Sequence, residues 1–309
     1  MLAASLRLGL IGAGRWGRNY IRTIAGLDSL RLAGLASNNP ECTQWVPREC
    51  HITSDWRTIL DSRLIDGVII ATPPHLHIEM ACAAVRAGIP VLVEKPLALD
   101  SAQAGKLRDL VAEHDGFVMV GHTHLFHPAF RQLKAVAPKY GKIRSIDSEA
   151  GNFGPFRADT PVLWDWGSHD VAMCLDLLGS IPDQIVSRRI ETRMVPEGLG
   201  EIVEIELSFP QGVGARIRVG NVLPKKRYFR AVMEKAALVY DDLNPNPLTA
   251  YPAPEFAAAM VVPSGDEKPL TKLVVEFAAA IREGRKDRAS LELGVAVVNV
   301  LQECAEELR

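Results

Sequence analysis

The feature that most constrains this chain is a glycine-rich turn close to its start, directly after an apolar run typical of a strand. Gly12, Gly14 and Gly17 follow a Gly-x-Gly-x-x-Gly spacing. In such a turn the first glycine permits the tight bend, the second lets a pyrophosphate approach the backbone, and the third lets the helix pack against the strand, while N–H groups at the helix start face the anion. The pattern alone is weak, but a helix over 15–27 and a second strand over 30–37 give it the βαβ context of a dinucleotide-binding unit.

Residues 1–123 alternate between strand-like and helix-like segments. The strand-like runs are short and rich in β-branched residues, which is typical of parallel strands covered on both faces. The expected strands cover 66–72, 90–94 and 117–121, and the expected helices cover 75–88 and 100–114. This alternation predicts an α/β Rossmann domain with a doubly wound parallel sheet.

Residues 124–309 have a different pattern, in which strand-like segments follow one another with few helix-like segments between them. After a helix over 127–137, the expected strands cover 143–149, 185–191, 202–209, 215–219, 229–234 and 238–241. A proline-rich stretch over 244–263 is expected to be a loop, and helices over 270–283 and 291–308 end the chain. We expect an α+β substrate-binding and oligomerisation domain whose open, mostly antiparallel sheet has helices on one face. An apolar open face would favour a homodimer or homotetramer.

Composition argues against several classes of partner. The net charge is −2 with 48% hydrophobic residues, so no basic field favours nucleic acid or an anionic membrane. No apolar run reaches the roughly 18 residues of a membrane span, and the N-terminal segment reads as a first strand rather than a signal peptide. The five scattered cysteines indicate a reducing compartment. A cytoplasmic protein without membrane or nucleic-acid partners is therefore expected.

Three further motifs, taken together with the glycine turn, resemble those of the Gfo/Idh/MocA family of NAD(P)-dependent oxidoreductases. They are Ala71-Thr72-Pro73-Pro74-His75-Leu76-His77, Glu94-Lys95-Pro96 and Asp165-Trp166-Gly167-Ser168-His169, and the likeness extends over nearly the whole chain. Residues 121–128 also resemble the subgroup that acts on sugars, including nucleotide sugars. The resemblance implies transfer of a hydride between nicotinamide and a carbinol or ketone of a sugar, cyclitol or nucleotide-sugar derivative.

The resemblance also implies a set of cofactor-binding residues. They are Gly12, Gly14, Arg15, Trp16, Gly17, Ser37, Asn38, Thr72, Pro73, His77, Glu94 and Lys95. The chain departs from the family at Ser37 and Asn38, where an acidic residue usually binds the ribose hydroxyls. No acidic residue here would repel a 2′-phosphate, and no adjacent arginine would bind one. Both NAD and NADP are therefore allowed, with a slight preference for NADP. Many relatives have an arginine where Leu125 stands, so contacts inferred for that position do not transfer.

Lys95, Asp165 and His169 are the expected catalytic residues. Lys95 follows a strand at the sheet edge where such folds bind ligands, and its ammonium can stabilise charge on a reacting oxygen. Asp165 and His169 are four residues apart, so a helix over 164–178 would place both on one face, where the carboxylate orients the imidazole for proton exchange. Asp170 is an alternative partner for His169. The competing interpretations are a surface lysine and a capped helix start with a surface histidine.

Other residues have weaker signals. His77 could reach the nicotinamide or could serve helix capping and packing. His122, His124 and His127 suggest a metal site, but no carboxylate or thiol completes the set, and we expect no metal. Arg157 could hold a phosphate or carboxylate of the substrate, although a solvated arginine is the more common case.

Two other functions fit the same residues. One is a non-catalytic sensor or regulator that binds the dinucleotide without turning over a substrate. The other is a reductase of a different small carbonyl, or a diol dehydrogenase acting for example on a trans-dihydrodiol. Reduction of bound cofactor by a panel of small sugar-like molecules separates these functions.

Overall fold

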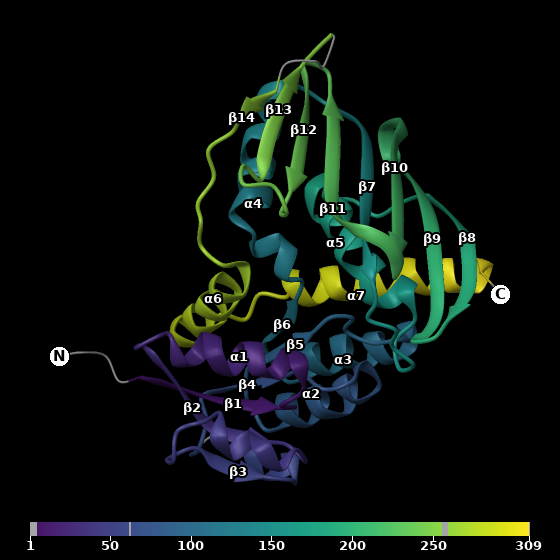
Figure 1. Cartoon of the computed structure of the whole chain (residues 1–309). Helices are drawn as coiled ribbons and strands as arrows, with labels where there is room; N and C mark the ends of the chain where they lie inside the picture. The colour runs from purple at the N-terminus through teal and green to yellow at the C-terminus, as the bar shows by residue number, and fades with distance from the viewer. Residues whose placement is uncertain (1–4, 62, 255–258, 309) are drawn as a thin grey trace. The chain divides into compact units, whose positions relative to one another are not determined.

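The computed structural model describes residues 5–61, 63–254 and 259–308, which divide into two compact units (Figure 1). The N-terminal unit comprises Met1–Gly121 and Leu270–Val295, and the C-terminal unit comprises His122–Pro269 and Ala296–Arg309. The break after Gly121 differs by two residues from the expected one. A single C-terminal domain over 124–309 was wrong, however, because residues 270–295 pack with the Rossmann sheet.

The sheet of the N-terminal unit is parallel throughout, as expected for a doubly wound fold. Its strand order is β3-β2-β1-β4-β5-β6. The strands are β1 (Leu6–Ile11), β2 (Leu30–Ala36), β3 (His51–Thr53), β4 (Gly67–Ile70), β5 (Val91–Glu94) and β6 (Val118–Gly121). Every residue of β4, β5 and β6 is buried, and each large apolar side chain there contributes roughly 1.5–3 kcal/mol. The edge strand β3 was not expected, because three partly exposed residues have too short a pattern to detect.

Helices cover the parallel sheet. They are α1 (Arg15–Ala25), α2 (His77–Arg86), α3 (Ser101–Glu113) and α6 (Pro269–Glu283). The Asp100 side chain caps α3 by accepting a hydrogen bond of 2.8 Å from the backbone N of Gln103. Phe277 of α6 stacks on Phe117 with ring centroids 6.4 Å apart. This apolar contact explains why α6 belongs to the N-terminal unit, since the sequence pattern of an amphipathic helix does not say which sheet it covers.

The sheet of the C-terminal unit has eight strands in the order β14-β13-β12-β11-β7-β10-β9-β8. They are β7 (Ile143–Phe153), β8 (Gln184–Val195), β9 (Gly198–Phe209), β10 (Val213–Gly220), β11 (Val222–Met233), β12 (Ala236–Asp241), β13 (Leu248–Pro252) and β14 (Met260–Val261). All pairs are antiparallel except β7 with β10, so the expected mostly antiparallel sheet is confirmed. The expected loop over 244–263 was wrong in part, because it contains β13 and β14. Prolines obscured a strand that lies toward the sheet edge.

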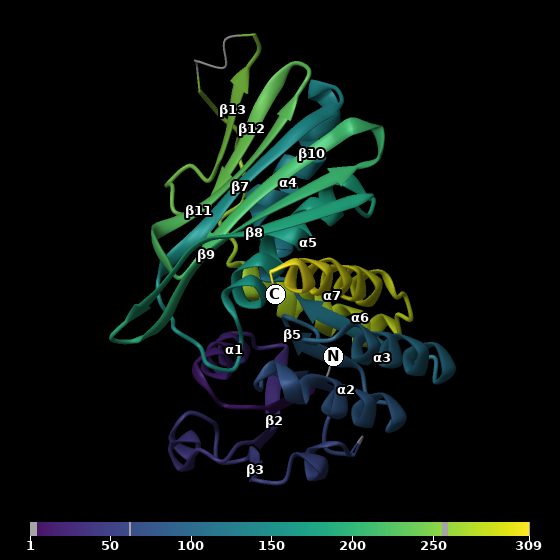
Figure 2. The same ribbon diagram turned by 90° about the vertical axis from the view of Figure 1, so that its right-hand side faces the viewer.

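One face of this sheet is covered by α4 (Pro128–Val136) and α5 (Ser168–Leu178), which lie on the same side in Figure 2. A π-helical turn over Leu163–Gly167 leads into α5. The last helix, α7 (Ala289–Glu307), contributes to both units, and its Cys304 carbonyl accepts a hydrogen bond of 2.7 Å from Ser187 of β8. Across the described residues, no helix combines the length and apolar character needed to cross a membrane.

The other face of the sheet carries charged side chains, so it is not the apolar open face that would favour an oligomer. Glu206, Arg216, Asp147 and Arg230 stand side by side on β9, β10, β7 and β11 in alternating sign. Four exposed large apolar side chains lie on the β8–β9 hairpin. They are Val186, Ile190, Met194 and Leu199. Period-two alternation predicts a polar face and an apolar face, but the cross-strand register decides that opposite charges become neighbours.

Candidate active site

The glycine turn between β1 and α1 has the geometry that its sequence predicted. Gly12 has a φ of +99°, and a Cβ on it would lie 2.6 Å from the Ala71 carbonyl oxygen. A Cβ on Gly17 would lie 2.0 Å from the Gly12 carbonyl oxygen, so helix and strand approach too closely for any side chain. A Cβ on Gly14 would have no heavy atom within 4 Å other than those of its chain neighbours. The backbone is therefore open where a pyrophosphate is expected to approach.

An open cavity of about 590 Å³ adjoins this turn and is strongly basic. It is lined by Ala13, Gly14, Arg15, Arg18, Asn19, Arg22 and Asn39. Three guanidinium groups beside an open helix start fit the diphosphate of a nicotinamide dinucleotide. Sequence reasoning included Arg15 and Gly14 but missed Arg18, Arg22 and Asn39. The i, i+3, i+7 spacing of the three arginines on the expected helix was the signal that could have found them.

Ser37 follows β2 at the carboxyl edge of the sheet, where the ribose is expected. Its Oγ accepts a hydrogen bond of 3.1 Å from the backbone N of Asn39, and Asn39 in turn accepts one from the backbone N of Glu41. The Ser37 hydroxyl hydrogen can still be donated to a ligand. Asn38 is exposed in the same loop. Contact of Ser37 and Asn38 with a ribose remains a prediction.

Glu94 was expected to contact the cofactor, and the structure shows its carboxylate engaged with other residues of the protein. Its side chain is buried, and its carboxylate accepts hydrogen bonds from the Tyr20 hydroxyl at 2.5 Å, from the Trp16 indole N–H, and from the Lys95 backbone N at 3.2 Å. Burial raises the pKa of Glu94 and the hydrogen bonds oppose that shift. Glu94 therefore fastens α1 to the end of β5, and the half-buried Lys95 follows it directly at the sheet edge.

For His77, a position near the nicotinamide and a role in helix capping or packing were both expected, and the structure favours packing. Its side chain has no exposed surface, and its ring nitrogens lie 3.0 Å from the Pro96 carbonyl oxygen and 2.9 Å from the Thr72 carbonyl oxygen. The imidazole joins the segments after β4 and β5, so its role is packing and positioning. Thr72 and Pro73 lie at this same edge, where a cofactor contact remains a prediction.

In the C-terminal unit, Asp165 belongs to the π-helical turn and His169 to α5, so the regular helix expected over 164–178 was wrong at its start. Asp165 Oδ1 lies 3.5 Å from an Arg157 guanidinium nitrogen, and Arg157 also pairs with Asp159 at 3.1 Å. A π-helical turn is uncommon and recurs at functional sites. Arg157 is exposed, as expected of a solvated arginine, and it pairs with the carboxylates of both Asp159 and Asp165.

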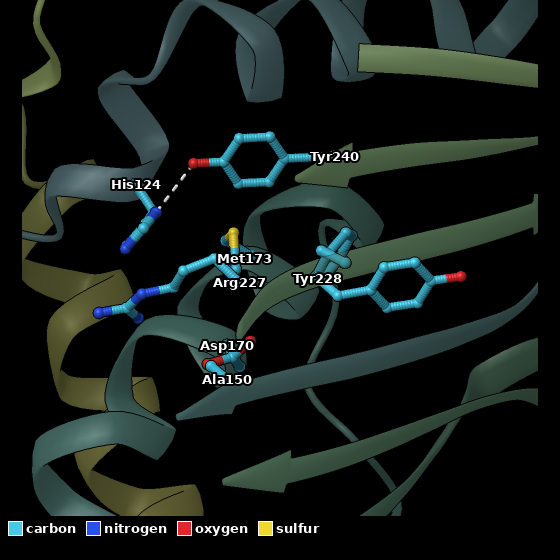
Figure 3. Close-up of a pocket in the computed structure, with 8 residues that line it drawn as sticks. His124, Ala150, Asp170, Met173, Arg227, Tyr228 and Tyr240 are labelled. Atoms are coloured by element: carbon cyan, nitrogen blue, oxygen red, sulfur yellow. Dashed lines mark hydrogen bonds between the residues drawn. The ribbon is translucent and has the colours of Figure 1, made fainter. Parts of the chain in front are cut away.

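A second imidazole contacts His169, which sequence reasoning did not predict. The rings of His124 and His169 meet edge to face with centroids 4.8 Å apart. His124 Nδ1 lies 2.9 Å from the Tyr240 hydroxyl and 3.9 Å from Asp242 Oδ2. Figure 3 shows His124 and Tyr240 directed toward one another beside a small cavity. Tyr240 and Asp242 come from β12 and the residue after it, so only the strand order brings them here.

Asp170, the alternative partner of His169, is directed elsewhere. Its Oδ1 accepts a hydrogen bond from the Ser148 hydroxyl, and its Oδ2 is buried without a hydrogen-bond partner among the described residues. Burial raises the pKa of Asp170 to about 6, and Arg227 opposes this shift. Asp170 and Arg227 line a cavity of about 10 Å³, room for roughly one water molecule (Figure 3).

Burial shifts the pKa values of three further groups near His124 toward their neutral forms. Burial raises the pKa of Asp242 and raises that of Tyr240 well above its ordinary value, while burial lowers the pKa of His127. The Arg227 guanidinium stacks on the Trp166 ring at 4.5 Å. In the described part of the chain, no group of three or more histidine, cysteine or acidic side chains is arranged to hold a metal ion. The cluster thus offers hydrogen bonds and proton exchange.

A family model matches the N-terminal part of the chain, and a solved structure matches nearly all of it. A family model described as "Oxidoreductase family, NAD-binding Rossmann fold" matches residues 6–122. A solved structure of a protein from Magnetospirillum magnetotacticum MS-1 is 43% identical to this chain, covers 97% of it and 100% of its own length, and has a TM-score of 0.92. The folds of both units therefore occur in a known structure.

Two relatives have named activities. A UDP-N-acetylglucosamine 3-dehydrogenase from Acidithiobacillus ferrooxidans is 31% identical over 57% of this chain and 56% of its own length. A 4-carboxy-2-hydroxymuconate-6-semialdehyde dehydrogenase from Sphingobium sp. is 27% identical over 98% of this chain and 99% of its own length. The chain thus spans just over half of the first relative and nearly all of the second, and the two named substrates are chemically different.

Proposed function

Because the chain belongs to the Gfo/Idh/MocA family of oxidoreductases, we propose that it is an NAD(P)-dependent dehydrogenase acting on a CH–OH group of a sugar, cyclitol or nucleotide-sugar derivative. The observation that carries this proposal is the contact between His169 and His124 beside the acidic turn of Asp165. A protein that only binds a dinucleotide has no need of this second polar cluster in its other unit.

Different residues of the chain have different roles in this proposed reaction. A bound nicotinamide ring would accept the hydride from the carbinol carbon. His169 takes the hydroxyl proton, Lys95 stabilises the negative charge that develops on the oxygen, and Asp165 orients the imidazole. Arg157 holds the Asp165 carboxylate through their 3.5 Å ion pair. In the reverse direction His169 returns the proton to the oxygen as the carbonyl is reduced.

The chemistry of the side chains around His124 supports this substrate class. Tyr240, His124 and Asp242 offer several hydrogen-bonding atoms within a small volume, which suits a ligand with neighbouring hydroxyl groups. The UDP-N-acetylglucosamine dehydrogenase relative favours the same class. A second candidate is a small carbonyl or hemiacetal substrate with a carboxylate, because the full-length relative oxidises a carboxylated semialdehyde and Arg157 could bind such a group.

We propose NADP as the preferred cofactor, because neither Ser37 nor Asn38 would repel a 2′-phosphate. The five cysteines are free, which agrees with the reducing cytoplasm proposed for this enzyme. We further propose a homodimer or homotetramer built on the charged face of the eight-stranded sheet.

The test combines a substrate screen with two variants. Sugars, cyclitols, nucleotide sugars and carboxylated aldehydes are screened for change in nicotinamide absorbance. With the best substrate, Lys95→Met and His169→Asn should each lower the rate of hydride transfer by roughly 10²-fold or more, the scale of a lost acid–base or electrostatic group. Stopped-flow measurement under single turnover reports this rate directly.

The matched controls are Lys106→Met and His114→Asn, which remove the same side chains from exposed positions of the N-terminal unit. Neither should change the rate. Cofactor affinity should barely change in His169→Asn, since the glycine turn is untouched. Near wild-type rates in folded Lys95→Met or His169→Asn would reject the catalytic assignment. Tight dinucleotide binding without turnover of any compound would favour a sensor.

A further inference from the structure

Helix α1 presents a stripe of three arginines on its exposed side. Arg15, Arg18 and Arg22 are spaced i, i+3 and i+7, so their side chains share one face. The opposite face is apolar and buried, with Tyr20 and Ile24 in the core of the N-terminal unit. The stripe is therefore not needed to fold the helix.

The stripe is electrostatically unfavourable in the protein without a ligand. Arg15 begins α1 at the positive end of the helix dipole, and no acidic residue lies in its first turn. Within the described residues, neither Arg15 nor Arg22 takes part in an ion pair. Arg18 pairs only loosely, with its nitrogen 3.4 Å from a Glu41 oxygen that is largely exposed. Like charges at these spacings repel one another, and a bound anion would reduce this repulsion.

The space beside the stripe is the cavity of about 590 Å³ described above, and its far wall comes from the loop after β2. Asn39 lines it, and Ser37 lies two residues earlier in the same loop. In this fold that loop contacts the ribose of the adenosine. The Arg18 guanidinium lies 3.7 Å from the centroid of the Trp45 ring, so stacking holds it in place before any ligand arrives.

We propose that Arg18, supported by Arg22 and Asn39, binds the 2′-phosphate of the adenosine ribose and thereby makes the protein select NADP over NAD. Arg15 lies next to Gly14 and serves the pyrophosphate that both cofactors share. This inference rests on the proposed function, because it needs a dinucleotide on the glycine turn. The proposal places the phosphate site on α1, because no arginine lies beside Ser37 in the sequence.

The experiment measures equilibrium affinities of NADP, NAD, 2′,5′-ADP and 5′-AMP by calorimetry, without any substrate. Wild-type protein should bind NADP and 2′,5′-ADP more tightly than NAD and 5′-AMP. Arg18→Gln should raise the Kd for NADP and 2′,5′-ADP by on the order of tenfold or more, as for a lost hydrogen bond between charged groups. The Kd values for NAD and 5′-AMP should change less than about twofold by the same reasoning. Arg86→Gln, which removes an exposed arginine at the end of α2, is the matched control and should change none of the four.

Glu41 supplies a second, opposite test. If it is only the weak counter-ion of Arg18, Glu41→Gln should leave NAD affinity unchanged and should strengthen NADP binding, because it removes a carboxylate near the phosphate. A loss of NAD affinity in Glu41→Gln would mean that Glu41 binds the ribose hydroxyls, and it would overturn the proposal.

The outcomes separate the two proposals. If neither dinucleotide binds the wild-type protein, the proposed function fails and the inference fails with it. If both bind equally, or if Arg18→Gln weakens both to the same degree, the proposed function stands and the phosphate site on α1 is rejected.

Discussion

At the scale of single residues, Asp170 shows how surroundings decide chemistry. Its sequence position beside His169 made it a candidate partner of the imidazole, yet its carboxylate faces Ser148 and a cavity the size of a water molecule. Because burial raises its pKa to about 6 from 3.8, the folded protein holds the proton more tightly than the unfolded chain does. Between those two pH values the folded state binds more protons, so stability falls as pH rises.

Asp170→Asn should remove this dependence. We expect the variant to be more stable than wild type by about 3 kcal/mol at pH 8, where the buried wild-type carboxylate is charged. The gain should be smaller at pH 5, where Asp170 is largely protonated in the folded state. Urea unfolding at the two pH values measures this difference, and the exposed Asp183→Asn is the control. An equal effect of Asp170→Asn at both pH values would contradict the raised pKa.

At the scale of elements, the β1–α1 turn assigns different tasks to glycines that look alike in the sequence. Gly17 is required for packing, because a Cβ there would lie 2.0 Å from a backbone oxygen. Gly14 has open space around it and an ordinary φ of −69°. The fold therefore tolerates a side chain at Gly14 and not at Gly17, although both are part of one motif.

Two substitutions separate these tasks. Gly17→Ala should destabilise the N-terminal unit by roughly 2–4 kcal/mol, since backbone atoms must move apart, on the scale of the larger single-mutation effects. Gly14→Val should unfold at nearly the wild-type denaturant concentration but should lose dinucleotide affinity by tenfold or more, because its branched side chain fills the pyrophosphate approach. Unchanged cofactor affinity in folded Gly14→Val would reject the assigned cofactor site.

At the scale of the whole molecule, the charged face of the eight-stranded sheet bears on assembly. A two-fold interface joins one surface to an identical copy, so it must carry both signs of charge in complementary places. The alternation of Glu206, Arg216, Asp147 and Arg230 supplies both signs. Ion pairs within the face, such as Lys226 with Glu149 at 2.8 Å, hold its side chains in place.

A homodimer or homotetramer built on this face should depend on salt. Raising ionic strength from about 0.05 M to 1 M shortens the Debye length to about 3 Å and should raise the dissociation constant. Arg216→Glu, which breaks the alternation, should favour monomers, and Arg108→Glu on α3 of the other unit should not. Light scattering after size exclusion gives the mass directly. A monomer at every concentration, or an oligomer indifferent to Arg216→Glu, would contradict this assembly.

The sequence by itself determined the elements whose signals are local. The glycine spacing and short β-branched runs such as Val91–Glu94 were sufficient to predict the parallel sheet, because each strand there is buried on both faces and each turn needs particular residues. Lys95, Asp165 and His169 were predicted to be catalytic because short motifs resembling those of the family contain them, and this remains a prediction. The edge strand β3 and the strands within 244–263 were missed, because strands of two to five residues are too short to show a period, and prolines lie beside those within 244–263.

Only the tertiary structure decided which side chains meet. The pairing of Tyr240 with His124 depends on strand order, and the basic cavity beside Arg18 depends on how α1 lies against the loop after β2. The carboxylate of Glu94 and the imidazole of His77 were expected to contact a cofactor, but packing turned both inward. Local sequence sets backbone conformation and the polarity of each face, whereas the neighbours of a side chain are set by contacts between residues far apart in the chain.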